Sequence, residues 1–201
     1  MQKLLLGTQN RGKQDELLAL LSNLRIEILT PEQMGIDIQV EETGSTYAEN
    51  ARLKAVAYAS HSGLWSLSDD SGLEVEALDG APGLRSARLG GEGNSDTDRR
   101  RLLIEMLANH SRPWEARFRA TVCLAGPSGD IEFAEGQCMG EIIIEEHGTG
   151  GFGYDRIFLI HELGKTMAEL GMDEKNQISH RARAIMALRP ALETRLGLGK
   201  G

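Results

Sequence analysis

Residues 4–24 read LLLGTQNRGKQDELLALLSNL, and this stretch decides the fold class. The apolar run Leu4-Leu5-Leu6 predicts a short buried strand, and residues 7–12, bounded by two glycines, predict a loop. The leucines at positions 17, 18, 20, 21 and 24 have the spacing of one helix face. A strand, a glycine-containing loop and a helix in this order form the first unit of an α/β fold.

The rest of the chain alternates between strand and helix patterns, which predicts a mixed sheet flanked by helices. Residues 116–124 alternate apolar and polar side chains, and a turn at residues 126–130 reverses the chain, so we expect a hairpin. Further strands are expected at residues 25–29, 65–68, 72–78, 142–144 and 157–160. Helices are expected from a capping-box pattern at residues 46–49 to near Gly63, from Ser95 to about His110, and from Ser179 until Pro190 breaks or kinks it.

The composition is that of an acidic globular protein of 201 residues. Lys and Arg number 22 against 30 Asp and Glu, and the net charge of −8 argues against nucleic acid or an anionic membrane as a partner. No apolar run approaches the roughly 20 residues of a membrane span, and Met1 to Gly7 lack the charged start and cleavage site of a signal peptide, so we expect neither. The two cysteines, Cys123 and Cys138, are too few for a disulfide framework. We expect a single cytoplasmic domain over residues 1–201, or two lobes that share a core.

The segment Gly7-Thr8-Gln9-Asn10-Arg11-Gly12-Lys13 is a candidate phosphate site. It joins a strand to a helix whose N-terminus offers backbone N–H groups to an anion, and Lys13 adds a positive charge. The spacing satisfies the G-x-x-x-x-G-K part of a P-loop, but Gln14 stands where a P-loop needs Ser or Thr to hold Mg²⁺. The alternative is an ordinary loop with a solvated lysine.

Two acidic pairs, Glu41-Glu42 and Asp69-Asp70, are candidates for metal binding and proton transfer. Asp69-Asp70-Ser71-Gly72 follows the strand expected at residues 65–68, and ligands of α/β sheets usually bind at strand ends. Mg²⁺ takes one or two carboxylates plus waters and substrate phosphates, and a further carboxylate can accept a proton from an attacking water. The alternative, which the spacing alone favours, is two acidic turns, since Asp-Ser-Gly also makes a good turn.

Two later segments are candidates for binding the rest of a nucleotide. Gly148–Asp155 contains four glycines that allow close backbone approach, and Phe152 could stack on a base. Lys175 and Ser179-His180-Arg181 stand just before and at the start of the last expected helix, and an arginine would donate to a keto oxygen of a base. The alternatives are a flexible loop with Phe152 in the core and a basic helix face. Arg99-Arg100-Arg101 is interpreted as a solvated run.

Taken together, these segments resemble the inosine-triphosphate-pyrophosphatase-like family over Lys3 to about Leu188. The motifs that carry the resemblance are, in chain order, Thr8-x-Asn10-x-x-Lys13, Glu41-Glu42-Thr43-Gly44, Glu49-Asn50-Ala51-x-x-Lys54, Asp69-Asp70-Ser71-Gly72-Leu73, Gly80-Ala81-Pro82-Gly83, Gly150-Gly151-Phe152-Gly153-Tyr154-Asp155 and Ser179-His180-Arg181. Each motif is weak alone, and their common order makes the resemblance strong. The chain departs from the family pattern at Arg156, where proline is usual, and at Ser68, where a small apolar residue is common.

The resemblance implies an elongated α/β fold of two lobes with a central nucleotide cleft, and a homodimer. It implies Mg²⁺-dependent hydrolysis of the deaminated purine nucleoside triphosphates ITP, dITP and XTP to monophosphate and pyrophosphate, which cleanses the nucleotide pool. By resemblance, Asp70 is the proton acceptor and a metal ligand, with Glu41 the second metal ligand. The substrate-binding residues that it implies are Thr8, Gln9, Asn10, Arg11, Gly12, Lys13, Lys54 and Ser71 for the phosphates and sugar, and Phe152, Gly153, Tyr154, Asp155, Lys175, His180 and Arg181 for the base and adjoining groups.

Three other functions stay open at this point. One is a related pyrophosphatase that acts on modified pyrimidine or methylated nucleotides. Another is a P-loop kinase, against which Gln14 counts because Mg²⁺ would lose its hydroxyl ligand. The third is a nucleotide-binding sensor without catalysis, against which Asp69-Asp70 counts, because binding a triphosphate does not need a base.

Overall fold

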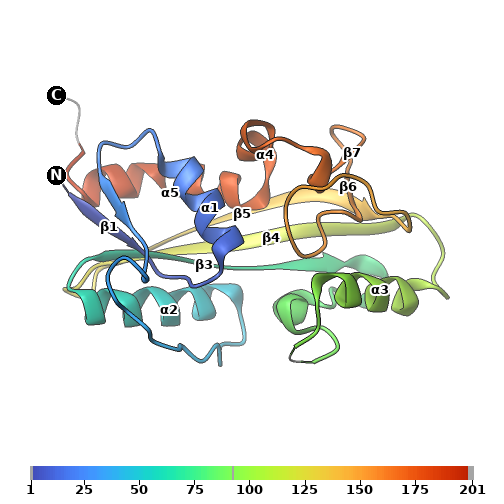
Figure 1. Ribbon diagram of the computed structural model, residues 1–201, viewed down its shortest axis with the longest axis horizontal. Coiled ribbons are helices and arrows are strands. Elements are labelled where there is room, and N and C mark those ends of the chain that lie inside the picture. Colours follow the sequence, from blue (N-terminus) through green and yellow to red (C-terminus); the bar gives the residue numbers. More distant parts are fainter. Residues whose placement is uncertain (1, 92, 199–201) are drawn as a thin grey trace. The chain divides into compact units, whose positions relative to one another are not determined.

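The structure is a computed structural model that describes residues 2–91 and 93–198 (Figure 1). Its helices are α1 (Arg11–Leu21), α2 (Tyr47–Ser62), α3 (Asp96–Leu107), α4 (Met172–Ile178) and α5 (His180–Arg195). Its strands are β1 (Lys3–Leu6), β2 (Glu27–Leu29), β3 (Trp65–Val75), β4 (Trp114–Ala125), β5 (Ile131–Ile142), β6 (Phe158–Ile160) and β7 (Lys165–Thr166). The domain expected over residues 1–201 also includes residues 1, 92 and 199–201, which lie outside the described residues.

The strands form one mixed seven-stranded sheet in the described part of the chain, in the order β2-β1-β3-β4-β5-β6-β7. β1 runs parallel to both β2 and β3, whereas β6 is antiparallel to both β5 and β7. Parallel neighbours joined through α1, together with a hairpin between β4 and β5, confirm the predicted α/β class with a mixed sheet and flanking helices.

The chain divides into two compact units. Unit 1 comprises the residues up to Asp70, Ala120–Gly136 and the residues from Arg181 onward. Unit 2 comprises Ser71–Arg119 and Gln137–His180. The boundary falls inside β3, β4 and β5, so these three strands contribute residues to both units.

In unit 1, helices cover both faces of the sheet, α1 and α5 on one and α2 on the other (Figure 1). Because successive strand residues point to opposite faces, Leu4 and Leu6 of β1 pack in one hydrophobic cluster with α1 and α5, while Leu5 packs in another. On β4, Cys123 and Ala125 pack against the alanines of α2. This double burial explains why the β1 sequence is a continuous apolar run.

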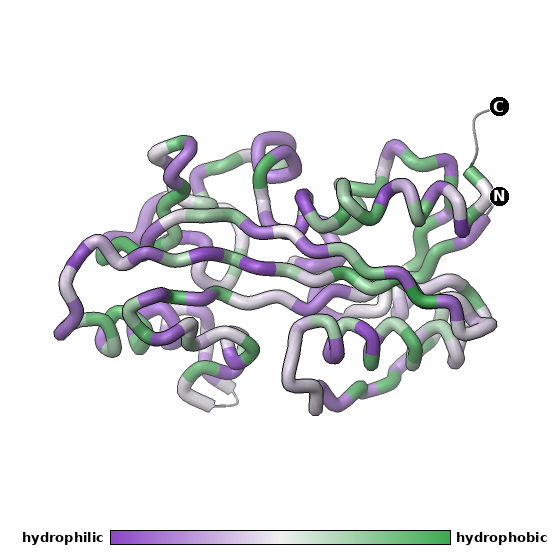
Figure 2. The backbone as a smooth tube through the Cα atoms, turned by 180° about the vertical axis from the view of Figure 1, so that it is seen from behind, coloured by the Kyte–Doolittle hydropathy of each residue, from purple (hydrophilic) through white to green (hydrophobic). Residues whose placement is uncertain are grey.

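Unit 2 has its own hydrophobic core. Leu73 and Val75 of β3 pack with Leu103 and Leu107 of α3 and with Phe158 of β6. Figure 2 shows apolar and polar stretches following one another along the strands. In the described residues, no helix has both the length and the apolar character that crossing a membrane would require.

Two strand predictions were wrong in the same way. Residues 65–68 and 72–78 were expected to be separate strands around an acidic turn, but β3 runs without interruption from Trp65 to Val75. Turn residues such as Asp, Ser and Gly stay in the strand because Asp69 is fully buried and has ion-pair partners there. Residues 142–144 are likewise not a separate strand, since β5 ends at Ile142.

The C-terminal helices also differ from the prediction. Pro190 does not end α5, which continues to Arg195. The helix spans both sides of the proline because Leu188 and Leu192 are buried in the same cluster as α1, and this burial offsets the lost N–H donor. A short helix that the sequence reading missed, α4, contains Lys175.

Gly7 has a packing role at the end of β1. Its N–H donates to Leu67 O at 2.7 Å and its carbonyl oxygen accepts from Ser68 Oγ at 2.9 Å. A Cβ at Gly7 would lie 2.1 Å from Ser68 Oγ and 2.9 Å from Ser66 Oγ. Glycine therefore allows the loop after β1 to lie against β3.

We expect Gly7→Ala to lower the free energy of unfolding by about 1–3 kcal/mol, the usual cost of overpacking a filled site. The closest contact is with the Ser68 hydroxyl, so the same substitution made in a Ser68→Ala background should cost less. Urea denaturation of the four proteins in this cycle measures both values. An equal cost in both backgrounds would show that the Ser68 contact is not the cause.

Candidate functional site

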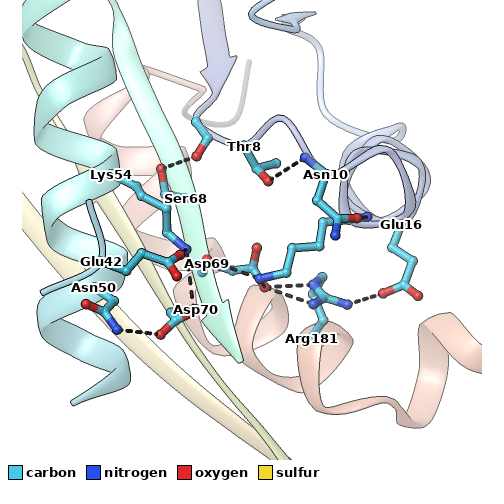
Figure 3. A network of polar contacts seen from close by, with 12 residues as sticks. Thr8, Asn10, Glu16, Glu42, Asn50, Lys54, Ser68, Asp69, Asp70 and Arg181 are labelled. Carbon is cyan, nitrogen blue, oxygen red and sulfur yellow. Dashed lines mark hydrogen bonds and ion pairs between the residues drawn. The ribbon is translucent and has the colours of Figure 1, made fainter. Parts of the chain in front are cut away.

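The acidic pair Asp69-Asp70 lies where the parallel pairing of β3 ends. Leu6, the last residue of β1, pairs with Leu67, and β3 continues beyond it. The two carboxylates therefore follow the carboxyl end of β1, the edge at which α/β sheets usually bind ligands. Adjacent strand residues point to opposite faces, and Figure 3 shows Asp69 turned toward Arg181 and Asp70 toward Asn50 and Lys54.

Asp69 belongs to a buried ion cluster. The guanidinium of Arg181 donates to Asp69 Oδ2 from Nε at 3.0 Å and from Nη2 at 2.9 Å, and its Nη1 donates to Glu16 Oε2. Asp69 and Arg181 are 0% and 1% exposed. Burial alone would raise the pKa of Asp69, but the charges of Arg181 and Lys13 hold it far below its usual value. The cations around Asp69 thus favour its ionised form.

Lys13 is held by the same carboxylate. Its Nζ lies 3.2 Å from Asp69 Oδ2 and 3.5 Å from the Asp69 carbonyl oxygen. Burial lowers the pKa of Lys13 below its ordinary value, although the charge of Asp69 opposes that shift. The contact brings the ammonium group from the first turn of α1 to the middle of β3.

The loop from Thr8 into α1 is closed by its own side chains. Asn10 caps the helix, its Oδ1 accepting from Lys13 N at 3.0 Å, and Thr8 Oγ1 accepts from Asn10 N at 3.2 Å. Gln14, which replaces the hydroxyl residue of a P-loop, donates to Thr8 O at 2.7 Å. Gln9, Asn10 and Arg11 are exposed. The first-turn N–H groups of a helix lack intrahelical partners, so this end of α1 remains suited to an anion.

Asp70 is held by two residues of α2. Asn50 Nδ2 donates to Asp70 Oδ2 at 3.1 Å, and Lys54 Nζ lies 3.5 Å from Oδ1. Burial raises the pKa of Asp70 above its usual value, although the charges of Lys54 and Lys13 oppose the shift. A carboxylate with a raised pKa is a better proton acceptor than an ordinary one.

Lys54 and Asn50 also hold the acidic segment before α2. Lys54 Nζ is 2.6 Å from Glu42 Oε1, and Asn50 Oδ1 accepts from Gly44 N at 2.8 Å. Burial alone would lower the pKa of Lys54, but the charges of Asp70, Asp69 and Glu42 raise it above its usual value. The structure thus brings Glu42 to this group, whereas Glu41 is exposed, and no contact among the described residues joins it to Asp70.

The donor set is compatible with a magnesium ion that has few protein ligands. The described residues contain no cluster of three or more His, Cys, Asp or Glu side chains placed to hold a metal. Mg²⁺ nevertheless needs only one or two carboxylates when substrate phosphates and waters complete its octahedron. Asp70 can supply one carboxylate and the Glu41-Glu42 segment the other. Asp69 Oδ1, which is buried, has no hydrogen-bond partner among the described residues.

In unit 2, the loop of residues 148–155 is held internally by Asp155. Asp155 Oδ2 accepts from Phe152 N at 3.0 Å and from Lys175 Nζ at 2.7 Å, and both charged side chains are buried. Gly151 has φ +68°, and a Cβ there would lie 2.0 Å from Asp155 Oδ2. This glycine is therefore needed for the turn around Asp155, in addition to any approach by a ligand.

The aromatic residues near this loop have different surroundings. Phe152 is half-buried, outside the core clusters, with Lys175 Nζ 5.6 Å from its ring centroid. Tyr154 lies in the unit 2 core, and its hydroxyl donates to Ser86 O at 2.8 Å. His180 stacks on Phe118 with ring centroids 4.8 Å apart. Phe152 is thus the ring of this set that is best placed to contact a ligand. Ser71 is half-buried in β3.

Sequence reasoning assigned no role to several residues that hold the proposed site residues. Among them are Glu16 and Asn50, described above, and Arg100. The reading of residues 99–101 as a solvated run was wrong for Arg100, which is 4% exposed and contacts Glu146 and Gly153. The motif Glu49-Asn50-Ala51-x-x-Lys54 contained a signal for Asn50, because Asn50 and Lys54 are four residues apart on one helix face.

Comparison with known proteins gives one consistent family. A family model described as the Ham1 family matches residues 4–191. A dITP/XTP pyrophosphatase of Exiguobacterium sibiricum is 46% identical over 97% of this chain and 99% of its own length, and one of Haemophilus influenzae is 44% identical over 95% and 99%. A solved HAM1 protein from Coxiella burnetii is 37% identical over 96% of this chain and 100% of its own, with a TM-score of 0.86.

The buried ion cluster predicts a large stability loss when its cation is removed. Arg181→Ala leaves Asp69 and Glu16 buried without this partner, and we expect it to lower the free energy of unfolding by about 3–5 kcal/mol. Arg195→Ala is the matched control on α5, because Arg195 pairs with Asp130 and Glu132 at the surface. Its loss should be below about 1 kcal/mol. Similar losses in the two variants, measured by urea denaturation, would contradict the importance of burial.

Proposed function

This chain belongs to the Ham1 family, and we propose that it hydrolyses deaminated purine nucleoside triphosphates (ITP, dITP and XTP) to the monophosphate and pyrophosphate. The observation that carries the proposal is the environment of the Asp70 carboxylate. This carboxylate accepts a hydrogen bond from Asn50 and lies beside Lys54, in the same unit as Lys13 and the N-terminus of α1, and burial raises its pKa. A proton acceptor close to phosphate-binding cations is what hydrolysis of a phosphoanhydride needs.

Residues of unit 1 would bind the triphosphate. The backbone at Arg11 and Gly12 and the ammonium groups of Lys13 and Lys54 supply positive charge. Asp69 supports this role because it holds Lys13 by an ion pair, while the charges of Arg181 and Lys13 lower the pKa of Asp69. Thr8 and Asn10 maintain the loop that leads into the helix.

Residues of unit 2 would bind the base. Phe152 would stack on the base, and Asp155 and Lys175 hold the loop that carries it. Arg181 requires a different interpretation from the one that the sequence favours. Since its guanidinium is committed to Asp69 and Glu16, we propose that it positions Asp69 instead of reading the base. Selection of deaminated bases would then rest on the polarity of groups around Phe152 and His180.

We propose that the reaction requires Mg²⁺, held by Asp70 and by a carboxylate of Glu41 or Glu42. Bound there, the ion would polarise the attacking water and neutralise phosphate charge. Asp70 accepts the proton of the water that attacks phosphorus, and Asn50 orients the carboxylate during this step. Lys13 and Lys54 stabilise the negative charge that collects on the departing pyrophosphate.

The comparisons favour this function over the other three. Relatives at 44–46% identity are named dITP/XTP pyrophosphatases, which favours a pyrophosphatase over a P-loop kinase. A pyrophosphatase for other modified nucleotides and a sensor without catalysis are outcomes of the assay below. The homodimer, the cytoplasmic location, the absence of nucleic-acid partners and the central cleft stay predictions of the resemblance.

The substrate range is tested by measuring pyrophosphate release from ITP, XTP, GTP, ATP and a pyrimidine triphosphate, with Mg²⁺ and with EDTA. We expect kcat/KM for ITP and XTP to exceed that for ATP by about 10- to 100-fold, since an amino group would leave a donor unpaired at the base edge. EDTA should abolish release. Release from none of the nucleotides would favour the sensor, and a preference for the pyrimidine would favour the related pyrophosphatase.

The role of Asp70 is tested by Asp70→Asn, with Asp15→Asn on the exposed face of α1 as the control. The amide keeps the shape of the side chain but accepts a proton poorly, so kcat should fall by about 100-fold or more. Calorimetric binding of ITP should persist, because Lys13 and Lys54 remain. Near-normal turnover by Asp70→Asn would show that another group is the base.

A further inference from the structure

Both backbone polar groups of Gly153 are bound by side chains of α3. The Gly153 N–H donates to Asp96 Oδ2 at 2.7 Å, and the Gly153 carbonyl oxygen accepts from Arg100 Nη1 at 2.8 Å. Asp96 and Arg100 are four residues apart, so they lie on one face of the helix. The helix therefore holds one residue of the loop 148–155 from both sides of its Cα.

Arg100 is fixed by more than this single contact. Its Nε and Nη2 donate to the two carboxylate oxygens of Glu146 at 2.7 and 3.1 Å, and Nη2 also donates to Thr97 Oγ1 at 3.1 Å. Such a two-point contact orients the plane of the guanidinium. The hydrogen bond of Arg100 to Gly153 thus comes from a rigid donor, which an exposed arginine could not provide.

The N-terminus of α3 is itself well defined. Ser95 and Asp98 form a complete capping box, in which Ser95 Oγ accepts from Asp98 N at 3.2 Å and Asp98 Oδ2 accepts from Ser95 N at 3.2 Å. This cap stabilises the start of α3, and the contact of Asp96 with Gly153 does not involve it. Among the described residues, Asp98 stabilises the start of the helix without contacting the loop, so Asp98→Ala controls for a loss of helix stability.

The loop needs an external support at this position. Asp155 binds Phe152 N and Lys175, which closes the turn from within. Gly153 has φ +62°. A glycine can adopt many other backbone conformations, so contacts from outside the loop are needed to keep Gly153 in this one. The orientation of Phe152 relative to the core residue Tyr154 depends on the peptide groups on either side of Gly153.

We propose that Asp96 and Arg100 are positioning residues for the proposed base-binding loop. By fixing the N–H and the carbonyl oxygen of Gly153, they hold the Phe152 ring in the orientation that stacks on a purine. The inference rests on the proposed function, because it assumes that this loop binds the base. It assigns no contact with substrate to either residue.

The kinetic test compares Asp96→Ala and Arg100→Ala with Asp98→Ala and Arg101→Ala, the latter an exposed neighbour. We expect KM for ITP to rise about tenfold or more in the first two, since each loses a hydrogen bond to a charged group, with kcat changed by less than about twofold. The two controls should keep the wild-type KM. Asp96→Asn, which retains an acceptor oxygen, should restore KM to near the wild-type value.

Amide hydrogen exchange gives a second readout that does not require activity. In Asp96→Ala, the Gly153 amide should exchange about tenfold faster or more than in the wild type, and in Asp98→Ala it should not. A merely structural role would raise exchange throughout α3 in both variants. This comparison remains informative if Arg100→Ala does not fold.

Two results would overturn the proposal. One is unchanged exchange at Gly153 in Asp96→Ala, and the other is a fall in kcat without a change in KM. If the wild type releases pyrophosphate from no nucleotide, the proposed function fails, and the role in base positioning fails with it. Faster exchange in Asp96→Ala would then still show that α3 holds the loop.

Discussion

The buried ion pair between Arg181 and Asp69 is the constraint on which unit 1 depends. A carboxylate with no exposed surface can remain charged only if cations lie against it, and Arg181 and Lys13 supply them from α5 and α1. Asp69 carries one negative charge against the two positive charges of Arg181 and Lys13. Glu16 supplies a second negative charge and accepts a hydrogen bond from Arg181. Two helices and strand β3 are thereby tied together, and Lys13 is directed toward the carboxyl end of β1.

The same constraint gives two adjacent aspartates different electrostatic environments. Strand geometry turns Asp69 and Asp70 to opposite faces, where they meet different partners. Cations hold the pKa of Asp69 far below its usual value, whereas burial raises that of Asp70, which faces the amide of Asn50 and a Lys54 shared with Glu42. Environments that move two carboxyl pKa values apart allow one to act as a fixed charge and the other as a proton acceptor.

Sequence patterns predicted the local elements better than the contacts between them. The α/β class, the β4–β5 hairpin and the cap of α2 by Thr46 followed from periodicity and capping signals. The continuity of β3 did not, because Asp, Ser and Gly prefer turns unless a distant cation is present, and Arg181 lies 112 residues from Asp69. The prediction that Pro190 breaks or kinks the last helix failed to foresee that α5 continues past it, because the residues on both sides of the proline are buried in one hydrophobic cluster.

In both the proposed phosphate-binding part and the proposed base-binding part of the site, charged side chains that are distant in sequence orient the groups of short motifs. Short motifs supply the groups that would do chemistry or contact the base, and these motifs can be read from the chain. The orientation of those groups comes from charged side chains far away in sequence, as with Arg100, which is 53 residues from Gly153. Because a buried charge needs an oppositely charged or hydrogen-bonding partner close to it, each of these contacts admits few alternative geometries. An acidic, glycine-rich chain can therefore hold flexible backbone in defined positions: its glycines permit the turns, and buried ion pairs select among them.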